Sequence, residues 1–146
     1  MGKKTMTYSQ WFEYRLNSIR VINRALIGEV MAFNDTHHKL KSAEKKFEKT
    51  KNLREALKQD VCLRKLRVLA AIIKNYRTSV KTLANDLLNA IGKHYDRINK
   101  KEREFDSTWF GLKNKAQANR EFQRVSDVVF EMEKITFSIG DYYDRF

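Results

Sequence analysis

The sequence predicts an all-α fold, an elongated antiparallel three-helix bundle with coiled-coil-like packing. The 146 residues include no proline and only five glycines, so few residues would interrupt a helix. Apolar residues recur every three or four positions, close to the 3.5-residue repeat of helices that pack along one seam. Turn and capping residues cluster at two main places, which leaves three helices in a single domain spanning residues 1–146.

The first helix is predicted over about residues 8–49. Its seam has polar residues at Asn23, His37 and Glu44, and its apolar members are Phe12, Leu16, Ile19, Leu26, Val30, Phe33, Leu40 and Phe47. Asn34 and Asp35 could cap a new helix, because their side chains accept hydrogen bonds from free backbone N–H groups. A break there would give a four-helix bundle, which is the alternative architecture.

The second helix is predicted over about residues 52–104, after a turn at 50–52. Asn52, with Glu55 three residues later, has the spacing of a capping box. Leu53 and Leu57 open the seam, which continues with Leu66, Leu69, Ile73, Tyr76, Val80, Leu83, Leu87, Ile91, Tyr95 and Ile98.

The third helix is predicted over about residues 113–142, after a second break at 106–111. Its seam consists of Phe122, Val125, Val129, Met132, Thr136, Ile139, Tyr143 and Phe146. The third helix is shorter than the second, so part of the second seam has no partner within the chain. A second copy or another protein is expected to cover it.

Positive charge is concentrated in residues 39–81, here called the basic hairpin. The chain has a net charge of +12, and this stretch holds fourteen basic and four acidic residues, a net of +10. By contrast, residues 121–146 hold six acidic and three basic residues, a net of −3. A concentrated positive surface attracts anionic partners. The residues predicted to bind one are Lys39, Lys41, Lys45, Lys46, Lys49, Lys51, Arg54, Lys58, Arg64 and Lys65.

These features favour a non-enzymatic interaction or scaffold protein, a subunit of a larger assembly whose basic hairpin meets an acidic protein partner. Homo-oligomerisation through the apolar seams is also expected. The terminal aromatic residues Tyr142, Tyr143 and Phe146 are the predicted docking residues for a protein partner. Sequence-independent binding of nucleic acid is one alternative. BAR-like binding to anionic membrane surfaces is another.

The sequence predicts no catalytic residue, metal site, cofactor or small-molecule substrate. His37 and His38 are adjacent, so on a helix their side chains diverge by about 100° and do not share one ligand. His94 is predicted at the surface. Cys62 is the only cysteine, which excludes an intrachain disulfide and favours a reducing, cytoplasmic compartment. The lack of a long apolar run predicts a chain that is neither secreted nor transmembrane.

Overall fold

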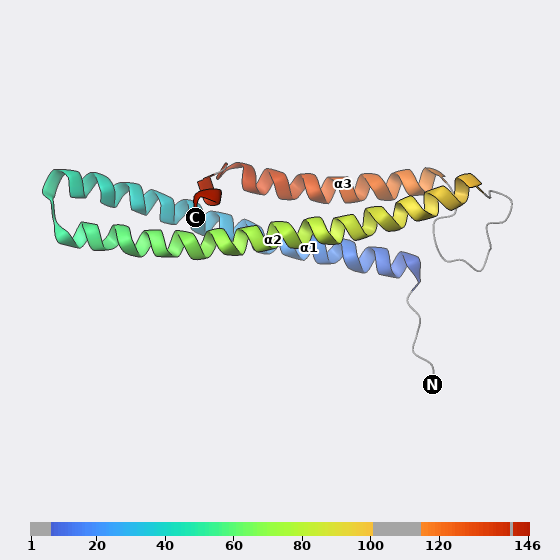
Figure 1. Ribbon diagram of the computed structural model, residues 1–146, viewed down its shortest axis with the longest axis horizontal. Helices are drawn as coiled ribbons and strands as arrows, with labels where there is room; N and C mark the ends of the chain where they lie inside the picture. The colour runs from blue at the N-terminus through green and yellow to red at the C-terminus, as the bar shows by residue number, and fades with distance from the viewer. Residues whose placement is uncertain (1–6, 101–114, 141) are drawn as a thin grey trace, which may run out of the picture. The chain divides into compact units, whose positions relative to one another are not determined.

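The computed structural model describes residues 7–100, 115–140 and 142–146, and the side chains of all of these except 96–100 and 115. Three long helices, α1 (Tyr8–Thr50), α2 (Leu53–Lys100) and α3 (Lys115–Phe137), are followed by a short 3-10 helix, η1 (Tyr142–Arg145) (Figure 1). The long helices pack against each other, α1 and α2 most extensively, and the described residues form no strand. The prediction of an all-α, three-helix fold is therefore confirmed.

The first helix is continuous through Asn34 and Asp35, so the four-helix alternative is wrong. Thr36, in the same segment, donates its hydroxyl hydrogen to the carbonyl oxygen of Ala32 at 2.8 Å. This is a bond within the helix, one turn back, and it does not require a break. The predicted break at 106–111 and the predicted helix limits near residues 104 and 113 lie outside the described residues.

Contacts divide the chain into two compact units, and each unit draws on all three helices. Unit 1 consists of Met1–Ile22 and Ser79–Glu131, and unit 2 consists of Asn23–Thr78 and Met132–Phe146. The prediction of a single domain stays a prediction. The fully buried large side chains of unit 1 are Phe12, Leu16, Ile19, Leu87, Val80 and Val125, and those of unit 2 are Leu26, Phe33, Leu66, Ile73 and Met132.

The helix directions in unit 1 follow from side-chain pairs between helices. Tyr8 and Arg15 of α1 contact His94 and Asp86 of α2, so these two helices run antiparallel. Tyr8 also contacts Glu121 of α3, and Glu13 contacts Arg124, so α1 and α3 run parallel. The predicted up-down-up order is therefore present in this unit.

The turn between α1 and α2 lies where the sequence predicts it. Lys51 has a φ of 52°, a left-handed conformation that ends α1 at Thr50. The side-chain oxygen of Asn52 accepts a hydrogen bond from the backbone N–H of Arg54 at 2.9 Å and so caps the start of α2. A capping box would have the Glu55 carboxylate accept a hydrogen bond from the backbone N–H of Asn52. Instead this carboxylate accepts a hydrogen bond from the ammonium group of Lys58 at 3.5 Å.

The buried seam of α1 changes phase in unit 2. Phe33, Thr36, Leu40 and Ala43 are buried, whereas His37 is half-buried and Glu44 is exposed. The prediction of His37 and Glu44 as seam residues is therefore wrong by one position. Two successive steps of three residues, from Val30 through Phe33 to Thr36, shift the stripe, as a local insertion does in a coiled coil.

The third helix differs from its prediction in the residue at which it ends and in the register of part of its buried seam. It ends at Phe137 and not near residue 142, and Gly140 follows with a φ of 53° that leads the chain into η1. Glu121 is buried where Phe122 was predicted, and Val128 where Val129 was predicted. Phe122 is 53% exposed, because the true stripe runs one residue earlier along this part of the helix.

Candidate functional site

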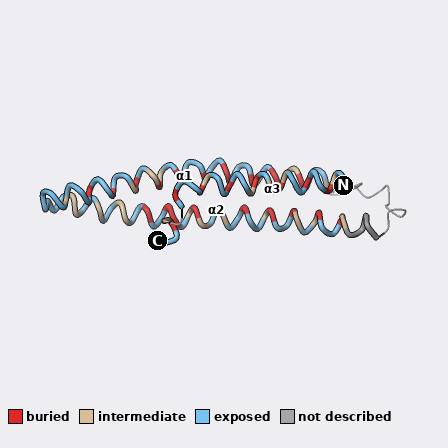
Figure 2. The backbone as a smooth tube through the Cα atoms, turned by 90° about the horizontal axis from the view of Figure 1, so that it is seen from above, coloured by how far each residue is buried: buried red, intermediate tan, exposed pale blue. Residues whose placement is uncertain are grey.

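The tip of the basic hairpin, residues 44–65, lacks buried residues although the structure describes all of it (Figure 2). Ala43 is the last buried residue of α1, and Leu66 is the first of α2. The prediction that Leu53 and Leu57 belong to the buried seam is therefore wrong, since their exposed fractions are 73% and 61%. Their side chains are available to a partner.

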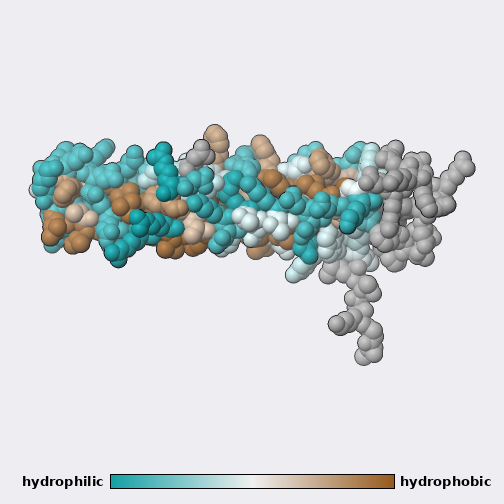
Figure 3. All heavy atoms as spheres, viewed as in Figure 1, coloured by the Kyte–Doolittle hydropathy of each residue, from teal (hydrophilic) through white to brown (hydrophobic). Residues whose placement is uncertain are grey.

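Four large apolar residues form an exposed row on α2. Leu53, Leu57, Val61 and Val68 are separated by four, four and seven positions, which places them on one side of the helix. Val61 is 64% exposed and Val68 is 60% exposed. Figure 3 shows hydrophobic atoms at the surface near the hairpin turn. Isolated exposed apolar residues are common, whereas several on one side of a helix, such as Leu53, Leu57 and Val61 one turn apart, are less usual.

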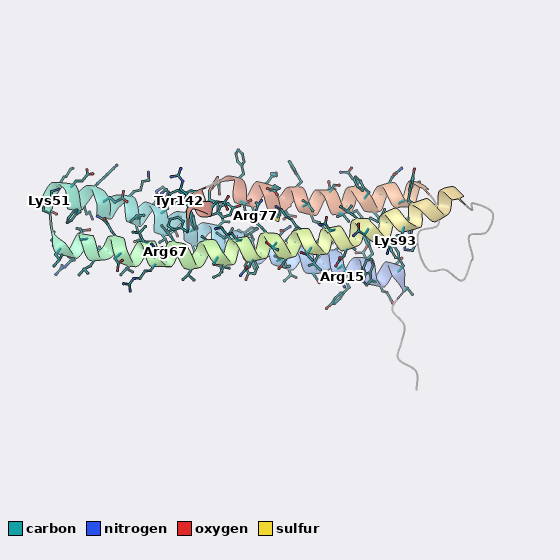
Figure 4. All side chains as sticks on the ribbon, in the orientation of Figure 1. Arg15, Lys51, Arg67, Arg77, Lys93 and Tyr142 are labelled. Atoms are coloured by element: carbon teal, nitrogen blue, oxygen red, sulfur yellow. The ribbon has the colours of Figure 1, made fainter. Side chains whose placement is uncertain are left out.

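All ten residues predicted to bind an anionic partner are exposed. Within the described residues, two of the ten form ion pairs: Lys58 with Glu55 at 3.5 Å and Arg64 with Asp60 at 3.0 Å. Lys51, which lies at the turn in Figure 4, has its ammonium group 5.4 Å from the centre of the Phe47 ring. The other eight of the ten form no ion pair within the described residues, although the four carboxylates of the tip reduce its net charge to +4.

A groove of about 490 Å³ opens between α1 and α2 beside this row. Ala43 is buried and both Cys62 and Glu55 are half-buried, so these three are the least exposed of its lining residues. The groove contains four cationic side chains and one carboxylate, Glu55, which is paired with Lys58. Its lining residues are Lys39, Ser42, Ala43 and Lys46 of α1 and Arg54, Glu55, Leu57, Lys58, Val61 and Cys62 of α2. It can hold an apolar side chain while attracting carboxylates to its edge.

The C-terminal aromatic residues pack within unit 2. Tyr143 is buried, and the ring centres of Tyr142 and Phe146 lie 5.9 and 6.1 Å from that of Phe33. Tyr142 also lies 4.3 Å from the ring of His37. Burial, and to a lesser extent the nearby positive charges, lower the pKa of His37. These rings hold η1 on α1, and the docking role predicted for Tyr142, Tyr143 and Phe146 stays a prediction.

Unit 1 holds a separate group of ionisable side chains. The Tyr8 hydroxyl donates to a carboxylate oxygen of Glu121 at 3.3 Å, and burial raises the pKa of both groups. Arg124 donates two hydrogen bonds to Glu13, which lower the pKa of that carboxyl group. The ring of His94 lies edge-on to Tyr8 at 4.7 Å. The residue is 8% exposed, so its predicted surface position is wrong.

These groups join helices and lie outside the groove. Among the described side chains, no set of three or more His, Cys, Asp or Glu residues is placed to hold a metal ion. Of the helices that the structure describes, none is both long enough and apolar enough to cross a membrane. Compared with known proteins, the chain matches no family model, no curated protein and no solved structure.

Proposed function

We propose that the chain is a non-enzymatic helical interaction protein, and that its basic hairpin binds an acidic, amphipathic segment of a protein partner. The observation that carries this proposal is the groove, where Leu57 and Val61 lie beside Lys46 and Arg54. An amphipathic acidic segment would use both properties at once. Its apolar side chains would leave water, and its carboxylates would pair with free cations.

The expected binding mode is a helix laid into a groove between two helices. An apolar residue of the partner would enter above Ala43 and Cys62, and its acidic residues would face Lys39, Lys46 and Arg54. The positive charge would raise the association rate, and burial of Leu57 and Val61 would lengthen the lifetime of the complex. Since the tip has no buried residues of its own, a bound partner would also stabilise the hairpin.

The groove favours a protein segment over the two other anionic partners. Phosphate contacts need cations alone and would leave the exposed apolar row in water. A flat lipid surface would meet the row but could not fill the recess lined by Ala43 and Cys62. Nucleic acid and anionic membrane are therefore alternative outcomes of the test.

The test measures the fluorescence anisotropy of a labelled, designed acidic amphipathic helix as the protein is added. Leu57→Ser with Val61→Ser should weaken binding by about tenfold or more through loss of apolar burial. Lys46→Glu with Arg54→Glu should weaken it by a similar factor through loss of charge pairing. The matched control, Arg24→Glu with Lys93→Glu, changes the same net charge at exposed positions outside the hairpin and should bind like the unaltered chain.

Parallel titrations with duplex DNA and with anionic vesicles distinguish the alternatives. Nucleic-acid binding would replace the proposal if the peptide failed to bind and DNA bound in a salt-sensitive way. In that case Leu57→Ser with Val61→Ser should leave the affinity for DNA unchanged. Tight binding to anionic vesicles without peptide binding would replace it with membrane binding. Cys62 supplies a second readout, because a peptide in the groove should slow its alkylation.

A further inference from the structure

The groove in unit 2 has two unlike walls, and the wall formed by α1 is cationic. Lys39, Ser42 and Lys46 line this wall, and their spacing of three and four residues places them on one face of the helix. All three are exposed, and no ion pair within the described residues involves either lysine. The α1 wall therefore offers two unpaired cations seven positions apart, which is about 10 Å along the helix.

The wall formed by α2 is more apolar and carries less net charge. Leu57 and Val61 line it and are 61% and 64% exposed. Glu55 and Lys58 also line it, and their 3.5 Å ion pair balances one positive charge with one negative charge. Arg54 is the second residue of α2, so it lies at the end of the groove next to the turn. Most of the α2 wall therefore offers apolar surface.

Glu55 is the one carboxylate among the lining residues, and it is well shielded from water. Its side chain is 13% exposed, whereas the other carboxylates that form ion pairs in the described part of the chain are 47% to 56% exposed. A shielded charge is screened less by salt than an exposed one. A partner's carboxylate placed beside Glu55 would be repelled by it and would have to compete with it for Lys58.

We propose that the groove orients its partner, with the acidic edge of the bound helix over α1 and its apolar face against α2, an inference that rests on the proposed function. The partner's carboxylates lie seven residues apart on one edge of its apolar stripe, because that interval matches Lys39 and Lys46 when the helices lie side by side. The opposite edge of the stripe carries no carboxylate, because Glu55 would meet it there.

Two labelled helical peptides of identical composition test this arrangement, each with one apolar stripe and two glutamates. In the first peptide the glutamates lie seven residues apart on one edge of the stripe, and in the second peptide one glutamate lies on each edge. A helix can enter the groove in either direction, so the first peptide can always turn its acidic edge to α1. The second peptide always leaves one glutamate beside α2. Fluorescence anisotropy should show that the first peptide binds about threefold or more tightly than the second.

Variants of the chain then assign the preference to the two walls. Lys39→Gln with Lys46→Gln should weaken binding of the first peptide by about fivefold or more and remove the preference. Glu55→Gln should strengthen binding of the second peptide more than binding of the first, because a carboxylate beside α2 is then no longer repelled. Circular dichroism checks that each variant keeps its helices.

Lys41→Gln with Lys45→Gln is the matched comparison, because both lysines are exposed on α1 and neither lines the groove. It removes the same charge from the same helix and should weaken the first peptide by less than about twofold. Equal affinity of the unaltered chain for the two peptides overturns the inference, and so does an equal loss from the two lysine pairs. In both of these cases the peptides still bind, so the proposed function holds. If neither peptide binds the unaltered chain, the inference and the proposed function both fail.

Discussion

Arg77 joins α2 to the C-terminal end of α3 in unit 2, and its removal gives the sharpest test of how that end is held. Its guanidinium donates to both carboxylate oxygens of Glu133, at 3.2 and 3.3 Å, and to the hydroxyl of Thr136. The same group lies 5.8 Å from the centre of the Tyr143 ring. Figure 4 shows Arg77 on α2 near the C-terminal segment that carries Tyr142.

The expected effect of Arg77→Met follows from these contacts. The arginine side chain is 16% exposed and Glu133 is 47% exposed, so the pair is partly shielded from water. Charge-assisted hydrogen bonds of this kind contribute about 1.5 to 3 kcal/mol, and the contact with the tyrosine ring adds about 0.5 to 1 kcal/mol. Methionine keeps the apolar stem, and Thr136 still donates to the carbonyl of Met132 at 3.2 Å. We therefore expect a loss of about 2 to 4 kcal/mol.

Urea unfolding followed by circular dichroism measures this loss. Arg67→Met is the matched control, because Arg67 is an exposed arginine on the same helix and its loss should change the free energy of unfolding by less than about 0.5 kcal/mol. A double-mutant cycle with Glu133→Gln isolates the ion pair from the ring contact. If Arg77→Met were no more destabilising than Arg67→Met, the side-chain bonds of Arg77 would not hold this end of α3.

Three further predictions concern the packed helices. Because burial lowers the pKa of His37 below its usual 6.5, the folded chain favours the neutral ring, and stability should fall as the pH drops from 6.5 through the lowered pKa of the folded chain. NMR of the Tyr142 ring should report this loosening, and His37→Gln should remove it. Asn23, buried on the α1 seam, should set helix register at a cost in stability, so Asn23→Leu should raise the melting temperature and broaden the set of oligomers seen by light scattering. Leu87→Ala should cost about 2 to 5 kcal/mol in urea unfolding, whereas Val21→Ala, at a 61% exposed position, should cost under about 0.5 kcal/mol.

The repeat of apolar residues was enough to predict the core of the first helix as far as Phe33. Phe12, Leu16 and Ile19 are all buried, because a 3.5-residue period leaves them one common face. Beyond Phe33 the same rule fails by one residue, at His37 and Glu44. At His37 the cause is a tertiary contact, since the ring packs on Tyr142 at the side of the seam. A periodicity within one helix holds no information on where η1 will lie.

The candidate site was predictable in its charge and not in its shape. Lysine and arginine rarely leave water, so the exposure of all ten predicted cations follows from residue type alone. The groove depends on how α1 and α2 pack against each other, which the pattern within either helix alone does not give. One feature of the sequence did indicate that this end of α2 departs from the buried seam. Leu53, Leu57 and Val61 recur every four residues, which departs from the 3.5-residue seam and carries them around the helix.

If the exposed row on α2 serves binding and not folding, its removal should lower the affinity for a partner and leave the free energy of unfolding nearly unchanged. Leu57 and Val61 are more than 60% exposed, so Leu57→Ser with Val61→Ser should change the free energy of unfolding by less than about 0.5 kcal/mol per residue. The same pair should lower affinity for an acidic partner about tenfold or more. Residues that serve the fold would show the opposite pattern, with lost stability and normal binding by the chains that remain folded. If urea unfolding gave a loss of several kcal/mol for this pair, the row would belong to the core and the hairpin would offer a partner only its charge.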